Sequence, residues 1–110
     1  MRILHTLGER NLGGLEFRTL EQAHWLTRHG HDTAIAAPPG SAISLAARQR
    51  GIATVDIDFD SPYSPATLWR LRRAVRRLHI DVIDSHGRAD GKTGALCRDL
   101  CAVVRTRHFA

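Results

Sequence analysis

Short apolar runs that alternate with helical patterns limit the fold of this 110-residue sequence more than any other feature. An apolar run at residues 3–6 is followed by the pair Gly13 and Gly14, a helical pattern over residues 15–29 and a second run at 33–37. This order predicts a strand, a helix and a parallel strand. A glycine pair before such a helix lets a phosphate approach free backbone N–H groups and the positive helix end. The same pair also suits a tight turn and close helix packing.

The remainder of the sequence repeats the alternation. Ser41 is a predicted N-cap for a short helix that ends at Gly51. Further strands are predicted at 53–57, 81–85 and 103–106, and further helices at about 68–78 and 90–100. Strands alternating with helices indicate a parallel sheet covered on both faces. We therefore predict an α/β three-layer Rossmann-like open parallel sheet with strand order 3-2-1-4-5.

The sequence stops directly after the fifth predicted strand. Complete domains normally cover such an open edge. We therefore expect residues 1–110 to be a partial domain, truncated after that strand.

The formal charge is +5, and arginines carry most of the positive charge. Several of them share one predicted helix with a stripe of apolar residues: Arg70, Arg72, Arg73, Arg76 and Arg77 alternate with Leu68, Leu71, Val75 and Leu78. This pattern is typical of a helix packed on a core with a solvated outer face. It also fits attraction to an anionic surface, either a membrane or nucleic acid. Aromatic residues make up only 5% of the chain, too few for stacking platforms, which disfavours single-stranded nucleic acid, and we expect no nucleic acid partner.

No run approaches the roughly 18 apolar residues of a membrane span, and no charged-then-apolar leader opens the chain. We therefore expect a cytoplasmic protein, with peripheral contact at the inner face of the membrane as a further expectation. Cys97 and Cys101 lie four residues apart in a helical pattern beside Leu96 and Leu100, so the two cysteines are predicted to be small residues that face the core. Two cysteines at this spacing do not form a zinc pattern.

Two nucleotide motifs are incomplete. The first loop lacks GxGxxG and the second strand ends in Ala36, Ala37 and Pro38 without an acidic residue, which disfavours NAD. The segment at Gly91, Lys92 and Thr93 resembles the end of a phosphate loop, but its first glycine is displaced by one place. A stand-alone nucleotide- or phosphate-binding domain remains one alternative function, and a non-enzymatic basic module that binds an anionic membrane is another.

Several segments in order resemble the N-terminal domain of GT-B fold glycosyltransferases of the family-4 type. They are residues 1–6, 13–16, 28–32, 39–41, 81–87 and 105–108. The resemblance implies that the glycine turn lies beside the donor diphosphate and that His86, after the fourth strand, faces the acceptor and the sugar. Asp84 departs from the pattern, because many members have histidine at its position.

The resemblance implies the N-terminal part of a nucleotide-sugar-dependent enzyme that transfers a hexose, with retention, to a cell-envelope glycan or lipid. The donor-binding domain of that family has no counterpart in residues 1–110, so we expect the fragment alone to be inactive. A nucleoside diphosphate sugar is the implied co-substrate, with no separate cofactor and no metal ion.

Candidate site residues follow from this resemblance. Gly13 and Gly14 are assigned to the donor phosphates and His86 to catalysis, and the acceptor-binding candidates are Glu16, Arg88, Asp90 and His108. An imidazole with a pKa near working pH suits the transfer of a hydroxyl proton. The alternatives are structural: His86 caps the next helix, Arg88 and Asp90 are surface charges, and Glu16 complements the helix dipole.

Overall fold

The fold is a five-stranded parallel sheet in the order β3-β2-β1-β4-β5. The computed structural model describes residues 1–8, 14–61 and 63–106, and the side chains of residues 14–16 lie outside the description. The strands are β1 (Arg2–Thr6), β2 (Asp32–Ala37), β3 (Ala53–Asp56), β4 (Val82–Ser85) and β5 (Ala102–Arg105). The predicted strand order and Rossmann-like class are confirmed, with strand ends within one residue of those predicted.

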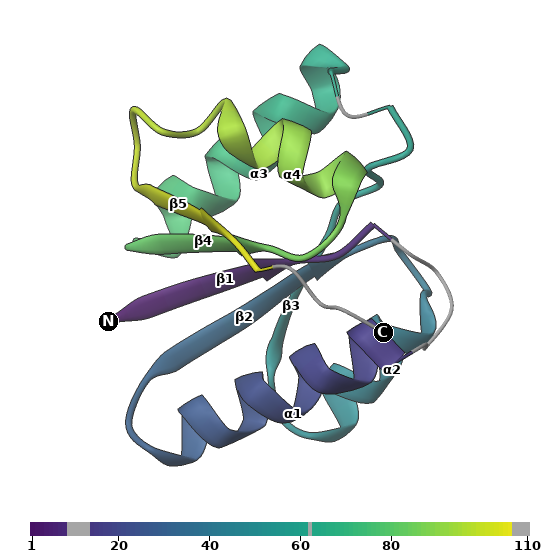
Figure 1. Cartoon of the computed structure of the whole chain (residues 1–110), viewed down its shortest axis with the longest axis vertical. Helices are drawn as coiled ribbons and strands as arrows, with labels where there is room; N and C mark the ends of the chain where they lie inside the picture. The colour runs from purple at the N-terminus through teal and green to yellow at the C-terminus, as the bar shows by residue number, and fades with distance from the viewer. Residues whose placement is uncertain (9–13, 62, 107–110) are drawn as a thin grey trace.

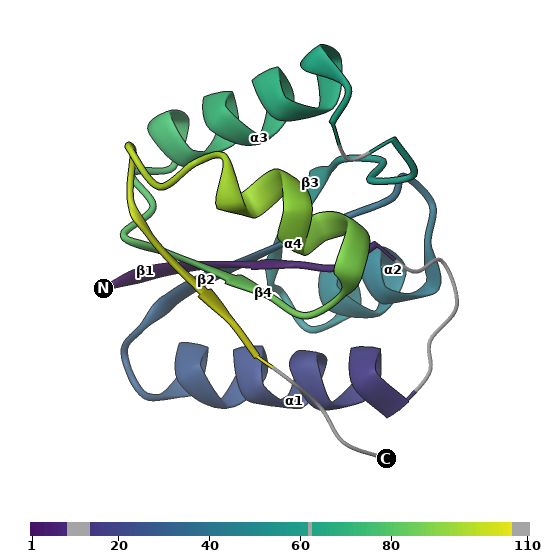
Figure 2. The same cartoon turned by 45° about the horizontal axis from the view of Figure 1, so that its top comes forward.

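Helices cover both faces of this sheet, as Figures 1 and 2 show. They are α1 (Gly14–Arg28), α2 (Ala42–Gln49), α3 (Pro65–Arg77) and α4 (Arg88–Ala95). The helices α1 and α2 lie on one face and α3 and α4 on the other. Each face buries its own apolar cluster, one centred on Leu20, Ile35 and Ile43 and the other on Leu4, Leu71 and Ile83. The three predicted layers are therefore present.

Local sequence signals set several helix ends. The side chain of Ser41 accepts a hydrogen bond from the backbone N–H of Ser44 at 3.3 Å, which confirms the predicted N-cap of α2. Gly51 follows α2 with φ of +73°, a conformation that glycine adopts without strain. Pro65 opens α3, where its missing N–H would have no helical partner.

The arginine-rich helix α3 is amphipathic, as predicted. Leu71 and Val75 are buried, and Leu68 and Leu78 pack partly buried against the same core. Most of its arginines are exposed: Arg70, Arg73, Arg76 and Arg77. Arg72 instead forms a two-pronged ion pair with Asp99, at 2.7 and 2.8 Å.

The predicted helix over residues 90–100 is wrong at its end, because α4 stops at Ala95 and turns follow. Arg72 holds these turns, donating to the Leu96 carbonyl oxygen at 3.1 Å in addition to its pair with Asp99. Leu96 is 45% exposed in these turns, whereas Cys97 is fully buried as predicted and Cys101 is partly buried. None of the described helices is long and apolar enough to cross a membrane.

Candidate functional site

Polar residues gather where β1 and β4 end. These strands are neighbours, yet the chain leaves β1 for α1 on one face and β4 for α4 on the other. A parallel sheet of this type binds ligands in the crevice at such a change of direction, beyond the carboxyl ends of the strands. His86 and Gly87 follow β4 at this point, and α1 begins nearby in sequence after β1. His86 and the start of α1 therefore lie at the carboxyl edge of the sheet.

Asp90 is fully buried in the first turn of α4. Its Oδ2 accepts hydrogen bonds from Thr6 Oγ1 at 2.8 Å and from the backbone N–H groups of His86 and Gly87 at 3.1 and 3.2 Å. Burial nevertheless raises the pKa of the Asp90 carboxyl group, and these hydrogen bonds oppose the shift. The interpretation of Asp90 as a surface charge is wrong. Its acceptor-binding role stays a prediction.

The same contacts bear on the incomplete phosphate loop. A phosphate loop offers backbone N–H groups at the start of a helix to the ligand. Here the Asp90 carboxylate already accepts the N–H groups of His86 and Gly87. Lys92 lies on the exposed side of α4 with its Nζ 5.9 Å from the centre of the Tyr63 ring. This arrangement does not favour phosphate binding at the segment.

Near the start of α4 is a buried cluster that we call the His–Asp–His cluster. Its members are His5, Asp84 and His86. Nδ1 of His5 lies 3.1 Å from Nε2 of His86, and Oδ2 of Asp84 lies 3.7 and 3.5 Å from these two atoms. Thr106 Oγ1 donates to the other carboxylate oxygen, Oδ1, at 2.5 Å. Burial lowers the pKa of the His5 imidazole, and the nearby Asp84 carboxylate opposes the shift.

His86 stands at the predicted edge, but its side chain is fully buried and contacts His5. The alternative that His86 caps α4 is wrong, because the N-cap of that helix is Gly87. Sequence reasoning did not identify His5 or Thr6 as parts of this site. A signal was present, since β1 is a central strand whose residues are buried on both faces, and two polar residues there require partners inside the protein.

The remaining candidates are placed only in part. Gly14 is the first residue of α1, and Glu16 lies in the first turn of that helix. Arg88 is the first residue of α4 and is exposed. Gly13 and His108 lie outside the described residues.

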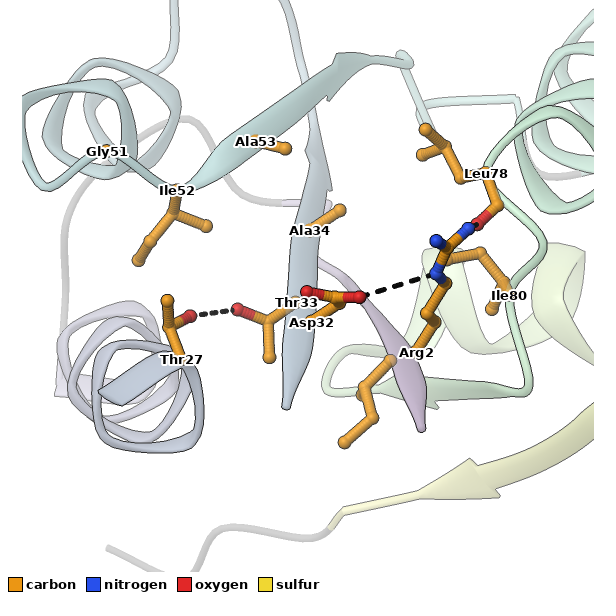
Figure 3. A pocket seen from close by; sticks show the side chains of 11 residues that line it. Arg2, Thr27, Asp32, Thr33, Ala34, Gly51, Ile52, Ala53, Leu78 and Ile80 are labelled. Atoms are coloured by element: carbon orange, nitrogen blue, oxygen red, sulfur yellow. Dashed lines mark hydrogen bonds and ion pairs between the residues drawn. The ribbon is translucent and has the colours of Figure 1, made fainter. Parts of the chain in front are cut away.

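A pocket of about 450 Å³ lies at the opposite, amino-terminal edge of the sheet, as Figure 3 shows. Arg2 Nε lies 3.4 Å from Asp32 Oδ2 there, and Arg2 also donates to the Leu78 carbonyl oxygen at 3.0 Å. The hydroxyl oxygens of Thr27 and Thr33 lie 2.6 Å apart. Because these polar groups already pair with one another, the carboxyl edge remains the candidate site.

The strand order defines an open, doubly wound α/β domain, a class in which ligands bind beyond the carboxyl ends of the strands where the order reverses, here at β1 and β4. The chain belongs to Glycosyltransferase Family 4, whose family model matches residues 12–110. A search of curated protein sequences found no match.

Similar solved structures share this fold at low sequence identity. They include MurG from Acinetobacter baumannii (TM-score 0.77, 17% identity, 96% of this chain and 34% of MurG). A glycosyltransferase from Rickettsia africae ESF-5 gives a TM-score of 0.76 at 18% identity, over 98% of this chain and 29% of that protein. The glycosyltransferase VinC in complex with dTDP gives a TM-score of 0.68 at 16% identity, over 97% of this chain and 34% of VinC. The chain therefore spans about a third of the length of these proteins.

Proposed function

We propose that this chain is the acceptor-side part of a nucleotide-sugar-dependent glycosyltransferase. The observation that carries the proposal is the Family 4 match over residues 12–110, which includes the start of α1, β4 and the start of α4. We further propose that the complete enzyme moves a hexose, with retention, to a glycan or lipid of the cell envelope on the cytoplasmic side. The complex of VinC with dTDP supports a nucleoside diphosphate donor.

In this proposal the N-terminus of α1 binds the donor diphosphate. A helix that begins at Gly14 offers backbone N–H groups and the positive end of its dipole to an anion. These groups would stabilise the leaving diphosphate without a metal ion. Gly13, directly before the helix, belongs to the same proposed contact.

His86 has the proposed catalytic role, and acceptor binding is assigned to Glu16, Arg88, Asp90 and His108. The position of His86 at the carboxyl end of β4 supports this role. Since its side chain is fully buried, with Nε2 beside His5, the ring has to become accessible before it can receive a proton from an acceptor hydroxyl. Arg88 is already exposed beside it and can meet acceptor hydroxyls without rearrangement.

The test compares the 110-residue chain with the same chain joined to the donor-binding domain of a Family 4 relative, using a panel of radiolabelled nucleotide sugars. We expect transfer only by the joined protein. Turnover by the 110-residue chain at about 1 per second or more, a typical enzymatic rate, would contradict the proposal.

Two variants of the joined protein separate the roles. We expect His86→Ala to lower the rate about a hundredfold or more with little change in donor affinity. Gly14→Val places a side chain where the diphosphate approaches, so donor affinity should fall together with the rate. His29→Ala is the matched control, because His29 is exposed beyond the far end of α1. Unchanged activity of the His86 variant would return that histidine to a structural role.

A second candidate function is binding of an anionic membrane surface by α3. The observation that favours it is the exposed row Arg70, Arg73, Arg76 and Arg77 beside Trp69, which is 59% exposed. Replacing Arg73, Arg76 and Arg77 by Gln should abolish sedimentation with phosphatidylglycerol vesicles. The control replaces the exposed Arg18 and Arg28 of α1, on the other face of the sheet. Equal loss in both variants would indicate a general charge effect.

A further inference from the structure

We propose that His5, Asp84 and His86 bind a divalent transition-metal ion, with zinc as the preferred ion. Two imidazole nitrogens and one carboxylate oxygen are a ligand set typical of zinc, with a fourth position left for water or another ligand. The proposal goes beyond glycosyl transfer and does not depend on it, because it concerns ion binding by the chain alone. A bound ion occupies Nε2 of His86, so that atom does not accept a proton while the ion is bound. It differs from the expectation, based on the sequence, that no metal ion is bound.

The separations of the ligand atoms carry the proposal. Nδ1 of His5, Nε2 of His86 and Oδ2 of Asp84 are 3.1, 3.5 and 3.7 Å apart. Nitrogen and oxygen ligands lie about 2.0–2.2 Å from zinc, so two ligands of a tetrahedral ion are about 3.3–3.6 Å apart. An ion can therefore sit between the three atoms after shifts of a few tenths of an ångström.

The backbone holds these ligands in place. His5 in β1 and Asp84 in β4 are directly opposite each other in the parallel ladder. The Thr106 hydroxyl donates to Oδ1 of Asp84, while Oδ2 is the oxygen nearest the two imidazoles. Hydrogen bonds of this kind orient ligating carboxylates in metal sites.

The charge of the cluster also favours a cation. Asp84 is buried, with 7% of its surface exposed. The contacts described for its carboxylate are two imidazoles and the Thr106 hydroxyl, and none of these is a permanent positive charge. A buried carboxylate is costly without a cationic partner. A divalent ion bound between Asp84 and the two histidines would supply that charge.

The experiment titrates tag-free, chelator-treated 110-residue chain with Co²⁺ and then with Zn²⁺. We expect visible absorption bands of tetrahedral Co²⁺ that reach their maximum at one ion per chain and disappear when Zn²⁺ displaces it. Nitrogen-detected NMR of the histidine rings should show Zn²⁺ shifting Nδ1 of His5 and Nε2 of His86. No tetrahedral Co²⁺ band, or shifts confined to other histidines, would overturn the proposal.

Variants then locate the ion. We expect His5→Gln and Asp84→Asn to abolish the Co²⁺ band. Thr106→Val removes only the orienting hydroxyl and should weaken binding about 10–100-fold. The control variant His29→Gln with His31→Gln removes two histidines outside the cluster and should bind as the parent does. If the buried substitutions prevent folding, Thr106→Val and the control still decide, because binding unchanged in Thr106→Val or lost in the control would overturn the proposal.

Discussion

The polar side chains at the two edges of the sheet differ in how deeply they are buried. At the carboxyl edge, His5, Asp84, His86 and Asp90 are buried and contact one another or nearby backbone. At the amino edge, polar side chains such as Arg2 line an open pocket and are paired near the surface. The open pocket therefore lies at the amino edge, whereas the buried histidine and aspartate side chains gather at the carboxyl edge. The proposed site is placed where the reactive groups converge.

The difference has a physical cause. In a parallel α/β fold the helices begin at the carboxyl edge, so their free N–H groups and positive ends point there. Buried acceptors such as Asp90 are stabilised by those donors. At the amino edge an exposed ion pair such as Arg2–Asp32 competes with water and contributes little.

The largest expected effect comes from breaking the carboxyl edge. Asp90→Ala removes the carboxylate that accepts hydrogen bonds from the Thr6 hydroxyl and from the backbone N–H groups of His86 and Gly87, and it leaves a cavity in a fully buried site. We expect the free energy of unfolding, measured in urea, to fall by about 3 kcal/mol. The matched substitution Asp32→Ala at the amino edge should cost less than about 1 kcal/mol. Similar losses in the two variants would remove the contrast between the edges.

The next effect tests packing of α4 on the sheet. A Cβ atom added at Gly94 would lie 2.7 Å from Ser85 Oγ and 3.6 Å from Ile83 Cγ2. Gly94→Ala should therefore lower the free energy of unfolding by about 1–3 kcal/mol, although alanine favours helices. Lys92→Ala, on the exposed side of the same helix, should leave stability within about 0.5 kcal/mol of the parent. A Gly94→Ala protein more stable than the parent would show that helix propensity outweighs this close contact.

The dependence of stability on pH sharpens the comparison. Burial raises the pKa of Asp90 above its usual 3.8, so the folded chain holds this proton more tightly than the unfolded chain. The resulting contribution to stability is present below pH 3.8 and is lost as pH rises through the raised pKa. In the Asp90→Asn variant the free energy of unfolding should no longer show this decrease as pH rises above 3.8. Urea unfolding measured from about pH 3 upward checks this expectation.

The pKa of Asp99 is shifted in the opposite direction to that of Asp90, so Asp99 serves as the control for that measurement. The Arg72 guanidinium lowers the pKa of Asp99 to about 2. Its contribution is therefore present above pH 3.8 and is lost as pH falls toward 2. An Asp99→Asn variant should be less stable than the parent above pH 3.8, and the difference should shrink as pH falls toward 2. If Asp90→Asn and Asp99→Asn change the pH dependence of the free energy of unfolding in the same direction, the contrast between the buried and the exposed carboxylate is wrong.

The smallest expected effect is a gain in stability in the turn that leads into β4. His79 is exposed and has φ of +53°, a conformation that costs most residues about 1–2 kcal/mol and glycine little. Because glycine also loses more chain entropy on folding, we expect His79→Gly to raise the free energy of unfolding by no more than about 1 kcal/mol. His29→Gly is the control and should give no gain. A less stable His79→Gly protein would contradict the expectation.

Some of the fold and of the site could be predicted residue by residue. The Ser41 cap, the apolar stripe through Leu71 and Val75 and the strand order follow from local periodicity and the rules of parallel sheets. The end of α4 could not be predicted, because Arg72 from another helix holds the turns at Leu96 and Asp99.

The sequence by itself determined the alternation of strands and helices, the family resemblance and the position of His86 after β4. These depend on neighbours in the chain and on short-range periodicity. Only the tertiary structure decided that Asp90 is buried and accepts hydrogen bonds at the start of α4, that Leu96 is exposed and that His5 and Asp84 meet His86. Those outcomes depend on contacts between residues up to 84 positions apart, such as Thr6 with Asp90, which parallel pairing of β1 and β4 creates.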